Sequence, residues 1–207
     1  MSQTALAQRF GSRTNSLVSL AATESVQKHL GIAGELVSRL NAINDDYRAA
    51  IDKELADAGI DYFAIRDLPT AERAAEMRKL SEVNRKLAAV YLPKLQESLT
   101  PDQILRLKQI QAQASGVDVW MEAEFATELD LTNEQKAKIT ELRNEYARRQ
   151  PTDGDIQQRI AKTRELNAER DAKAIELLSA AQKAKLDELK GAPFDVSQLG
   201  FRRRGNN

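Results

Sequence analysis

The segment from Leu131 to Leu142 reads LTNEQKAKITEL, and it predicts how this chain starts its helices. Thr132 stands just before an apolar-periodic run, and a glutamine follows it three residues later. In such a pair the hydroxyl accepts from an amide of the first turn, while the glutamine reaches back to the amide of the cap residue. Lys138, Ile139 and Leu142 continue the pattern with one basic and two apolar residues. The segment therefore predicts an amphipathic helix opened by a capping box.

The same pattern recurs along the chain. Its three clear copies are defined by Leu99, Thr100, Gln103, Leu131, Thr132, Gln135, Leu178, Ser179 and Gln182. We interpret these residues as helix caps that stabilise the fold, not as ligands. A weaker copy from Ile32 to Leu36 has lost both the threonine and the glutamine. It predicts a frayed or displaced helix start at Gly34 and Glu35.

The copies occur in pairs, which indicates an internal duplication. Adding 99 to the position of Ile32 gives Leu131, and adding 99 to the position of Tyr47 gives Tyr146. Each half is then a helical hairpin that begins and ends at a copy of the motif. The first hairpin, from Ile32 to Leu99, is 20 residues longer than the second. Shared between two helical arms, this excess extends the first hairpin by about 15 Å.

Apolar residues recur at steps of three and four along most of the 207 residues, as in amphipathic helices. We expect helices over residues 36–59, 70–95, 100–115, 120–128, 132–149, 155–177 and 179–190. The stripe predicted for the second of these is Met77, Leu80, Val83, Leu87, Val90 and Leu95. No run of alternating β-branched residues competes with these helices. The predicted fold class is all-α, with two tandem helical-hairpin units that form an elongated, cradle-like pseudo-dimer.

The predicted organisation has four parts. Residues 1–15 form a flexible N-terminus in which Ala5-Leu6-Ala7 is the remnant of a signal-peptide cleavage site. Residues 16–116 and 117–199 are the two helical units, and residues 200–207 are a flexible basic tail. Trp120, with Met121 and Phe125, is expected in the core at the join between the halves.

Composition excludes several classes of function. The 31 basic and 31 acidic residues balance, so the chain lacks the surplus of positive charge that binding to nucleic-acid phosphates requires. With no cysteine it has no thiolate nucleophile and no Cys-ligated metal. His29 is the only histidine and has no metal-ligand spacing around it. We expect no catalytic residue, no metal, no cofactor and no integral membrane segment, and so not an enzyme.

Two segments are candidates for contact with a partner. Tyr62, Phe63 and Ile65 lie in the connection of the longer hairpin and are either an exposed apolar patch or residues packed on neighbouring helices. The tail from Phe201 to Arg204 is either a weak contact for an acidic partner or a solubilising end.

The motifs at Leu99–Gln103, Leu131–Gln135 and Leu178–Gln182 resemble those of the LTxxQ-motif (Spy/CpxP-like) periplasmic protein family. The resemblance is strongest to a duplicated, planctomycete-type version, and by architecture it covers residues 24–190. It implies a periplasmic or otherwise extracytoplasmic all-α protein whose signal peptide has been removed. The better-known members are ATP-independent chaperones or envelope-stress proteins that form a cradle by dimerisation.

The first function that this resemblance implies is a helical binding protein that acts as a chaperone for unfolded polypeptides. The alternative is a structural or scaffolding protein that pairs with an envelope partner or with itself, without chaperone activity. The oligomeric state is predicted to be a monomeric pseudo-dimer or a homodimer.

Overall fold

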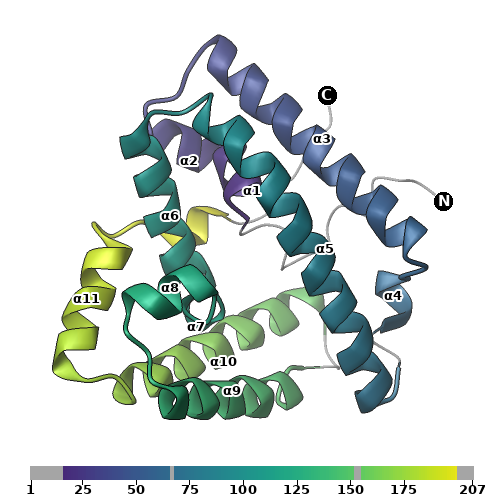
Figure 1. Cartoon of the computed structure of the whole chain (residues 1–207), viewed down its shortest axis with the longest axis vertical. Helices are drawn as coiled ribbons and strands as arrows, with labels where there is room; N and C mark the ends of the chain where they lie inside the picture. Colours follow the sequence, from purple (N-terminus) through teal and green to yellow (C-terminus); the bar gives the residue numbers. More distant parts are fainter. Residues whose placement is uncertain (1–15, 66–67, 152–154, 200–207) are drawn as a thin grey trace. The chain divides into compact units, whose positions relative to one another are not determined.

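The structure is a computed structural model that describes residues 16–65, 68–151 and 155–199. Every regular element in these ranges is a helix (Figure 1), which confirms the predicted all-α class. The Ala5-Leu6-Ala7 triplet and the tail from Phe201 to Arg204 lie outside the described residues. None of the helices in the described part is long and apolar enough to cross a membrane.

The chain divides into two compact units, and the division falls inside α6 (Pro101–Ser115). The first unit extends to Lys108 and includes the residues from Asp195 onward, and the second extends from Gln109 to Phe194. This differs from the expected boundary between residues 116 and 117. The second half of α6 joins the second unit because Ala112 is buried in the same core cluster as Trp120.

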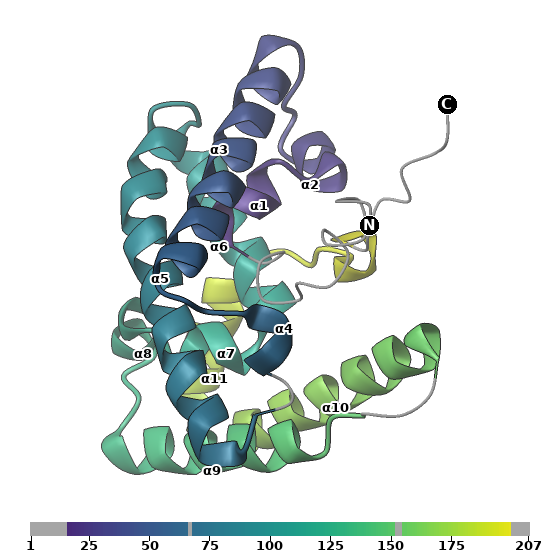
Figure 2. The ribbon, with the colours of Figure 1, turned by 90° about the vertical axis from the view of Figure 1, so that its right-hand side faces the viewer.

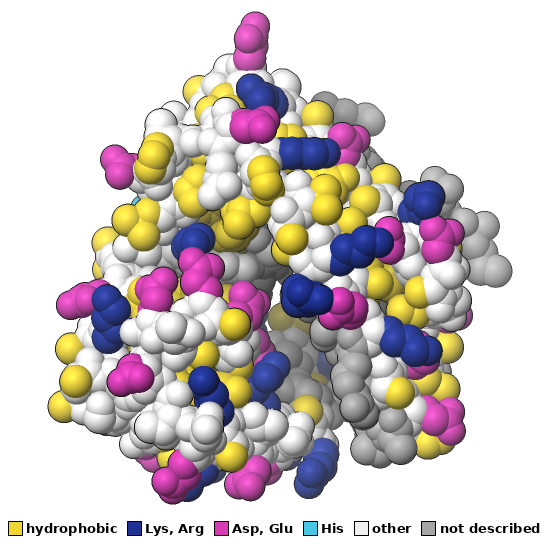
Figure 3. All heavy atoms as spheres, viewed as in Figure 1, with side chains coloured by type: hydrophobic (Ala, Val, Ile, Leu, Met, Phe, Trp, Pro, Cys, Tyr) yellow, Lys and Arg dark blue, Asp and Glu magenta, His cyan; other side chains and the backbone are white. Residues whose placement is uncertain are grey.

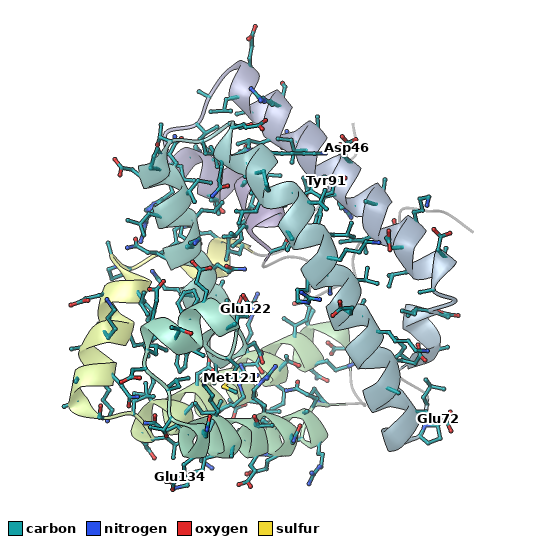
Figure 4. The ribbon with its side chains drawn as sticks, viewed as in Figure 1. Asp46, Glu72, Tyr91, Met121, Glu122 and Glu134 are labelled. Carbon is teal, nitrogen blue, oxygen red and sulfur yellow. The ribbon has the colours of Figure 1, made fainter. Side chains whose placement is uncertain are left out.

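The first unit is built mainly from one pair of long helices. Its elements are α1 (Leu17–Ala21), α2 (Glu24–His29), α3 (Glu35–Asp57), α4 (Tyr62–Ile65), α5 (Thr70–Gln96), the first part of α6, and a short 3-10 helix, η2 (Val196–Leu199). Helices α3 and α5 lie side by side (Figure 1). Tyr47 of α3 meets Tyr91 of α5 edge to face, with ring centroids 5.2 Å apart, and Figure 4 shows Tyr91 between the two helices. Helix α2 also packs on η2, where the Ser25 hydroxyl donates to the carbonyl of Gln198 at 3.1 Å.

Among the side chains of α5 that the structure describes, which do not include that of Met77, the buried stripe differs from the prediction at one position. Leu80, Val83 and Leu87 are buried as expected, but Val90 is 52% exposed and Tyr91 takes its place in the core. Steps of four residues carry the stripe from Leu87 through Tyr91, and the contact of Tyr91 with the other tyrosine ring fixes this choice.

The second unit contains α7 (Val117–Trp120), α8 (Ala123–Glu128), α9 (Asn133–Arg148), α10 (Ile156–Glu176) and α11 (Ala180–Lys190), together with the second part of α6. Figure 2 shows α9 running beside α10. The single helix expected over residues 120–128 is two helices, because the extended backbone of Glu122 ends one and caps the next. Trp120 and Phe125 lie in the core of this unit with Met121 packed against it, which confirms that these residues belong to a core.

The two hairpins differ in length less than their sequences suggest. Helix α3 has 23 residues against 16 in α9, and α5 has 27 against 21 in α10. The rest of the excess lies in the connections, where the first hairpin carries the short helix α4. The excess is therefore not all in the arms, and the expected difference in reach of about 15 Å is too large at 1.5 Å per residue.

One turn recurs in both units with the same backbone bonds. After α2, the amides of Leu30 and Ile32 donate to the carbonyls of Val26 and Gln27. After α8, residues 99 positions later repeat both bonds. The residue between the two donors has a positive φ in each case, 67° at Gly31 and 50° at Asp130. The two turns therefore share one backbone design.

The far half of the second hairpin is held by a buried tyrosine under charged side chains. Tyr146 of α9 is 1% exposed, and its hydroxyl donates to Glu169 of α10 at 2.6 Å. The guanidinium of Arg149 and the ammonium of Lys173 lie 4.4 Å and 5.4 Å from the centre of its ring. The hydrogen bond from Tyr146, followed by that from Arg149, lowers the pKa of Glu169 below its usual value.

An arginine joins the start of the second unit to its hairpin. The side chain of Arg170 on α10 is only 9% exposed and lies 3.1 Å from Asp118 on α7 and 2.9 Å from Asp171. Burial raises the pKa of Asp171, while Arg170 opposes that rise. A Cβ atom on Gly116 would stand 1.7 Å from the Asp171 carboxylate, so this close approach requires glycine.

Replacing Tyr146 with phenylalanine is expected to lower the free energy of unfolding relative to wild type. This loss should be larger at neutral pH than in acid. The pKa of Glu169 is lowered in the folded state, so its contribution is present above the unfolded value, near 4.5, and is lost as pH falls through the folded pKa. The difference in urea midpoint between Tyr146→Phe and wild type is therefore expected to shrink below about pH 4. A difference that stays constant from neutral pH to acid would contradict this account.

Candidate functional site

The three clear motif copies all form closed capping boxes. At α6 the Gln103 amide donates to the Thr100 hydroxyl at 3.2 Å, and the Thr100 amide donates to Oε1 of Gln103 at 3.0 Å. The pairs Thr132–Gln135 at α9 and Ser179–Gln182 at α11 repeat both bonds. The leucine before each cap is buried, at 5% for Leu99, 6% for Leu131 and 5% for Leu178. Each copy therefore closes a helix start and anchors it in a core.

In the second unit two motif glutamines also bind each other. Nε2 of Gln135 donates to Oε1 of Gln182 at 2.7 Å, and Nε2 of Gln182 donates to Oε1 of Gln135 at 2.9 Å. Each Nε2 group also donates across the pair, Gln135 to the carbonyl of Leu177 at 2.9 Å and Gln182 to that of Asp130 at 2.8 Å. This glutamine pair joins the starts of α9 and α11.

The hydrogen-bonding capacity of the glutamine pair is used up. A primary amide has two N–H donors and two acceptor lone pairs. Both N–H groups of Gln135 and of Gln182 are donated, and each Oε1 accepts from its own cap amide and from the other glutamine. Since the two side-chain amides have no donor or acceptor left for a ligand, the glutamine pair stabilises the fold and does not form a binding site.

The corresponding place in the first unit has only half of this arrangement. Nε2 of Gln103 donates to the carbonyl of Leu30 at 3.1 Å, as a motif glutamine does in the second unit. The position that would hold the second glutamine is Leu36, which has no side-chain amide to return the bond. Beside it, Nε of Arg106 donates to Nε2 of His29 at 2.9 Å, so the only histidine of the chain contacts the basic residue of a motif copy.

The weak copy starts its helix as predicted. Helix α3 begins at Glu35, and its cap residue is Gly34, which has a φ of 63° and provides no side-chain bond to the first turn. Helix α9 begins at Asn133, which corresponds to residue 34 after subtraction of the 99-residue offset. The start of α3 is therefore displaced by one residue and lacks the cap that the other copies have.

A hollow of about 450 Å³ lies beside the glutamine pair. It is lined by Glu128, Leu129, Asp130, Thr132, Gln135, Ser179, Ala181, Gln182 and Lys185. The glutamine amides in its wall bind each other, and the charged groups in its lining are the carboxylates of Glu128 and Asp130 and the ammonium of Lys185. Lys185 itself lies 3.4 Å from Glu188, so even this cation is partly compensated.

Of the predicted partner patch of Tyr62, Phe63 and Ile65, the structure describes only the side chain of Ile65, and that side chain is not exposed. Ile65 is 5% exposed, so it packs inside the first unit, the alternative that the sequence left open. The side chains of Tyr62 and Phe63 lie outside the described residues.

No group of three or more His, Cys, Asp or Glu in the described ranges could hold a metal ion. The acidic residues Asp45 and Asp46 are exposed, and Glu54 forms an ion pair with Lys86 at 2.9 Å between α3 and α5. These carboxylates are therefore surface groups of the first hairpin.

Sequence reasoning missed two sets of side-chain hydrogen bonds in the second unit. Asp155 and Gln158 form a fourth capping box at the start of α10, and the signal was present as an acidic cap residue followed by glutamine at the third position. Gln113 on α6 binds the segment after α11 through its side chain, and nothing in the local sequence distinguishes it from the neighbouring glutamines.

We expect the amide of Leu36 to exchange with solvent at least about tenfold faster than those of Gln103 and Gln135, because only the latter two donate to a cap hydroxyl. Hydrogen exchange measured by NMR under native conditions tests this. Equal protection of the three amides would mean that the start of α3 is capped by some other group.

The glutamine pair is expected to be strongly coupled. Gln135→Leu or Gln182→Leu alone should cost about 1–3 kcal/mol, because each leaves its partner amide without a bond, and the double variant should cost less than the sum. Urea unfolding of the four proteins in a double-mutant cycle measures this coupling. Gln103→Leu combined with Gln182→Leu is the control, and since these glutamines lie in different units their effects should add.

No family model, curated protein or solved structure matches the chain. The resemblance to LTxxQ-motif proteins therefore depends on the motif residues themselves and on the capping boxes that they form. What that resemblance implies about activity and location is carried forward as a proposal.

Proposed function

We propose that this chain is an extracytoplasmic helical binding protein that acts as an ATP-independent chaperone of the LTxxQ type. It holds unfolded or stress-exposed polypeptides on the outer faces of its helices. The single observation that carries the proposal is that the three clear copies of the motif form the same arrangement of hydrogen bonds. All three clear copies close a helix start, and in each the glutamine reaches on to a carbonyl of another turn.

The surface of the first unit supports this proposal. Val90 on α5 is 52% exposed and Leu105 on α6 is 58% exposed. Figure 3 shows Lys, Arg, Asp and Glu side chains interspersed with hydrophobic ones over the face in view. Isolated aliphatic side chains among long charged ones can make weak, adaptable contacts with many sequences without a deep pocket.

The charge balance of the chain fits the same role. With 31 basic and 31 acidic residues the surface attracts neither polyanions nor polycations as a class. Many of its charges are paired at short range, as in Lys138–Glu134 at 2.7 Å, where Figure 4 shows Glu134 at the start of α9. A client then contacts side chains that are already solvated and locally neutral, which favours reversible binding.

We expect the wild-type protein to suppress the aggregation of reduced α-lactalbumin at near-stoichiometric ratios without ATP. The double variant Val90→Gln and Leu105→Gln should suppress it less, because it removes exposed apolar surface from two helices. Turbidity at fixed client concentration measures the effect. Ala89→Gln is the matched control, since it introduces the same side chain on α5 at the cost of one exposed methyl group.

A scaffolding protein without chaperone activity would leave the turbidity unchanged at every ratio, and that result would replace the proposal with the alternative.

Light scattering on the purified protein without client tests the predicted pseudo-dimer. A mass of 23.1 kDa, that of a monomer, is expected if the two units of one chain form the cradle that single-unit members of the motif family form by dimerisation.

A further inference from the structure

The first part of α10 extends beyond the helix with which it pairs. At the end of α9, the side chains of Tyr146 and Arg149 both bond to Glu169 of α10. Helix α10 begins at Ile156, 13 residues before Glu169, and Figure 2 shows it continuing past the end of α9. At 1.5 Å per residue, about 20 Å of helix lies before Glu169. We call residues 156–164 the arm of α10.

The arm has positive charge and no negative charge. Its sequence, IQQRIAKTR, contains Arg159, Lys162 and Arg164 and no acidic residue. Lys162 pairs with Glu165 at 3.0 Å. In the described part of the chain, the guanidinium groups of Arg159 and Arg164 form neither an ion pair nor a side-chain hydrogen bond. Two cations of the arm are therefore available to a partner.

The carboxylates close to the arm in sequence are already engaged. Asp155 accepts from the amides of two residues in the first turn of α10. Glu165 is paired with Lys162, and Glu169 is paired with Arg149 at 3.1 Å. The two guanidinium groups of the arm are therefore a local surplus of positive charge, although the chain as a whole has a formal charge of zero.

The two arginines border an apolar stripe that is open at the arm. Ile160 is 37% exposed, whereas Ala174, which follows it on nearly the same side of α10, is fully buried in the core of the second unit. At 100° per residue these two positions differ by about 40° around the helix. Arg159 lies about 100° to one side of Ile160, and Arg164 lies about 40° to the other. An exposed aliphatic side chain thus stands between two guanidinium groups.

The chemistry of this face fits an acidic segment of polypeptide. Guanidinium groups bind carboxylates through paired hydrogen bonds, and the aliphatic side chain between them can contact an apolar residue of the same segment. A membrane or a nucleic acid fits less well. Each cation contributes only about 1 kcal/mol at an anionic membrane surface, and nucleic-acid binding depends on neutralising several phosphates. Two free guanidinium groups in a neutral chain are too few for either.

We propose that the arm of α10 is a docking surface for an acidic segment of a partner polypeptide. Carboxylates of the segment bind Arg159 and Arg164, and an apolar side chain of the segment contacts Ile160. The surface lies in the second unit and is independent of chaperone activity.

The probe is a fluorescein-labelled peptide, GEELLEELLEE, and its binding to the full-length protein is read by fluorescence anisotropy. Arg159→Gln combined with Arg164→Gln should weaken binding about tenfold, because two exposed charge pairs are lost. Ile160→Gln should weaken it less, through loss of apolar contact. The matched control is Arg39→Gln combined with Arg48→Gln, which removes the same charge from exposed arginines of α3 and should bind as wild type does.

Reversing the charges provides a second test that does not depend on a loss of binding. Arg159→Glu combined with Arg164→Glu should bind the basic peptide GKKLLKKLLKK, which wild type should not bind. Failure of wild type to bind the acidic peptide, or equal weakening by the control on α3, would overturn the proposal. It would also be overturned if wild type bound phosphatidylglycerol vesicles or single-stranded DNA more tightly than the acidic peptide, because the surface would then serve a phosphate-bearing partner.

Discussion

Every helix leaves the amides of its first turn without intrahelical partners, and in this chain α6, α9, α10 and α11 meet that requirement with capping boxes. A threonine or serine accepts one of these amides, and a glutamine accepts the amide of the cap residue itself. The glutamine N–H groups then extend to a neighbouring turn. In this way a local device becomes a tertiary one, and the reciprocal bond between Gln135 and Gln182 holds the starts of α9 and α11 together.

The comparison of the two units shows what this interaction contributes. Both units use the same turn after a short helix, with a positive φ at Gly31 and at Asp130. The first unit has leucine where the second has Gln135, and its long helix begins at an uncapped glycine. That unit instead gains from the paired rings of Tyr47 and Tyr91 in the longer hairpin, where the second unit buries one tyrosine against a carboxylate. The two long hairpins are thus stabilised by different contacts.

A side-chain amide is used in two ways on this scaffold. In the glutamine pair both amides are saturated by each other and by turns of the fold, so the motif stabilises without binding a ligand. Gln113 has the same chemistry, but its side chain binds the carbonyls of Lys190, the last residue of α11, and of Ala192, and accepts from the amide of Phe194. The motif glutamines and Gln113 therefore differ in their partners, and residue type alone does not distinguish them.

The sequence by itself determined the all-α class, the helix starts at Thr100, Thr132 and Ser179, and the weak start near Gly34, because caps and apolar periodicity are local properties that short segments encode. Only the tertiary structure decided which side chains meet across long separations. It placed Tyr91 and not Val90 in the core, buried Ile65, put the unit boundary inside α6, and joined Gln135 to Gln182 across 47 residues. These outcomes depend on how whole helices pack, and a pattern within one helix carries no information about the face that its neighbour presents.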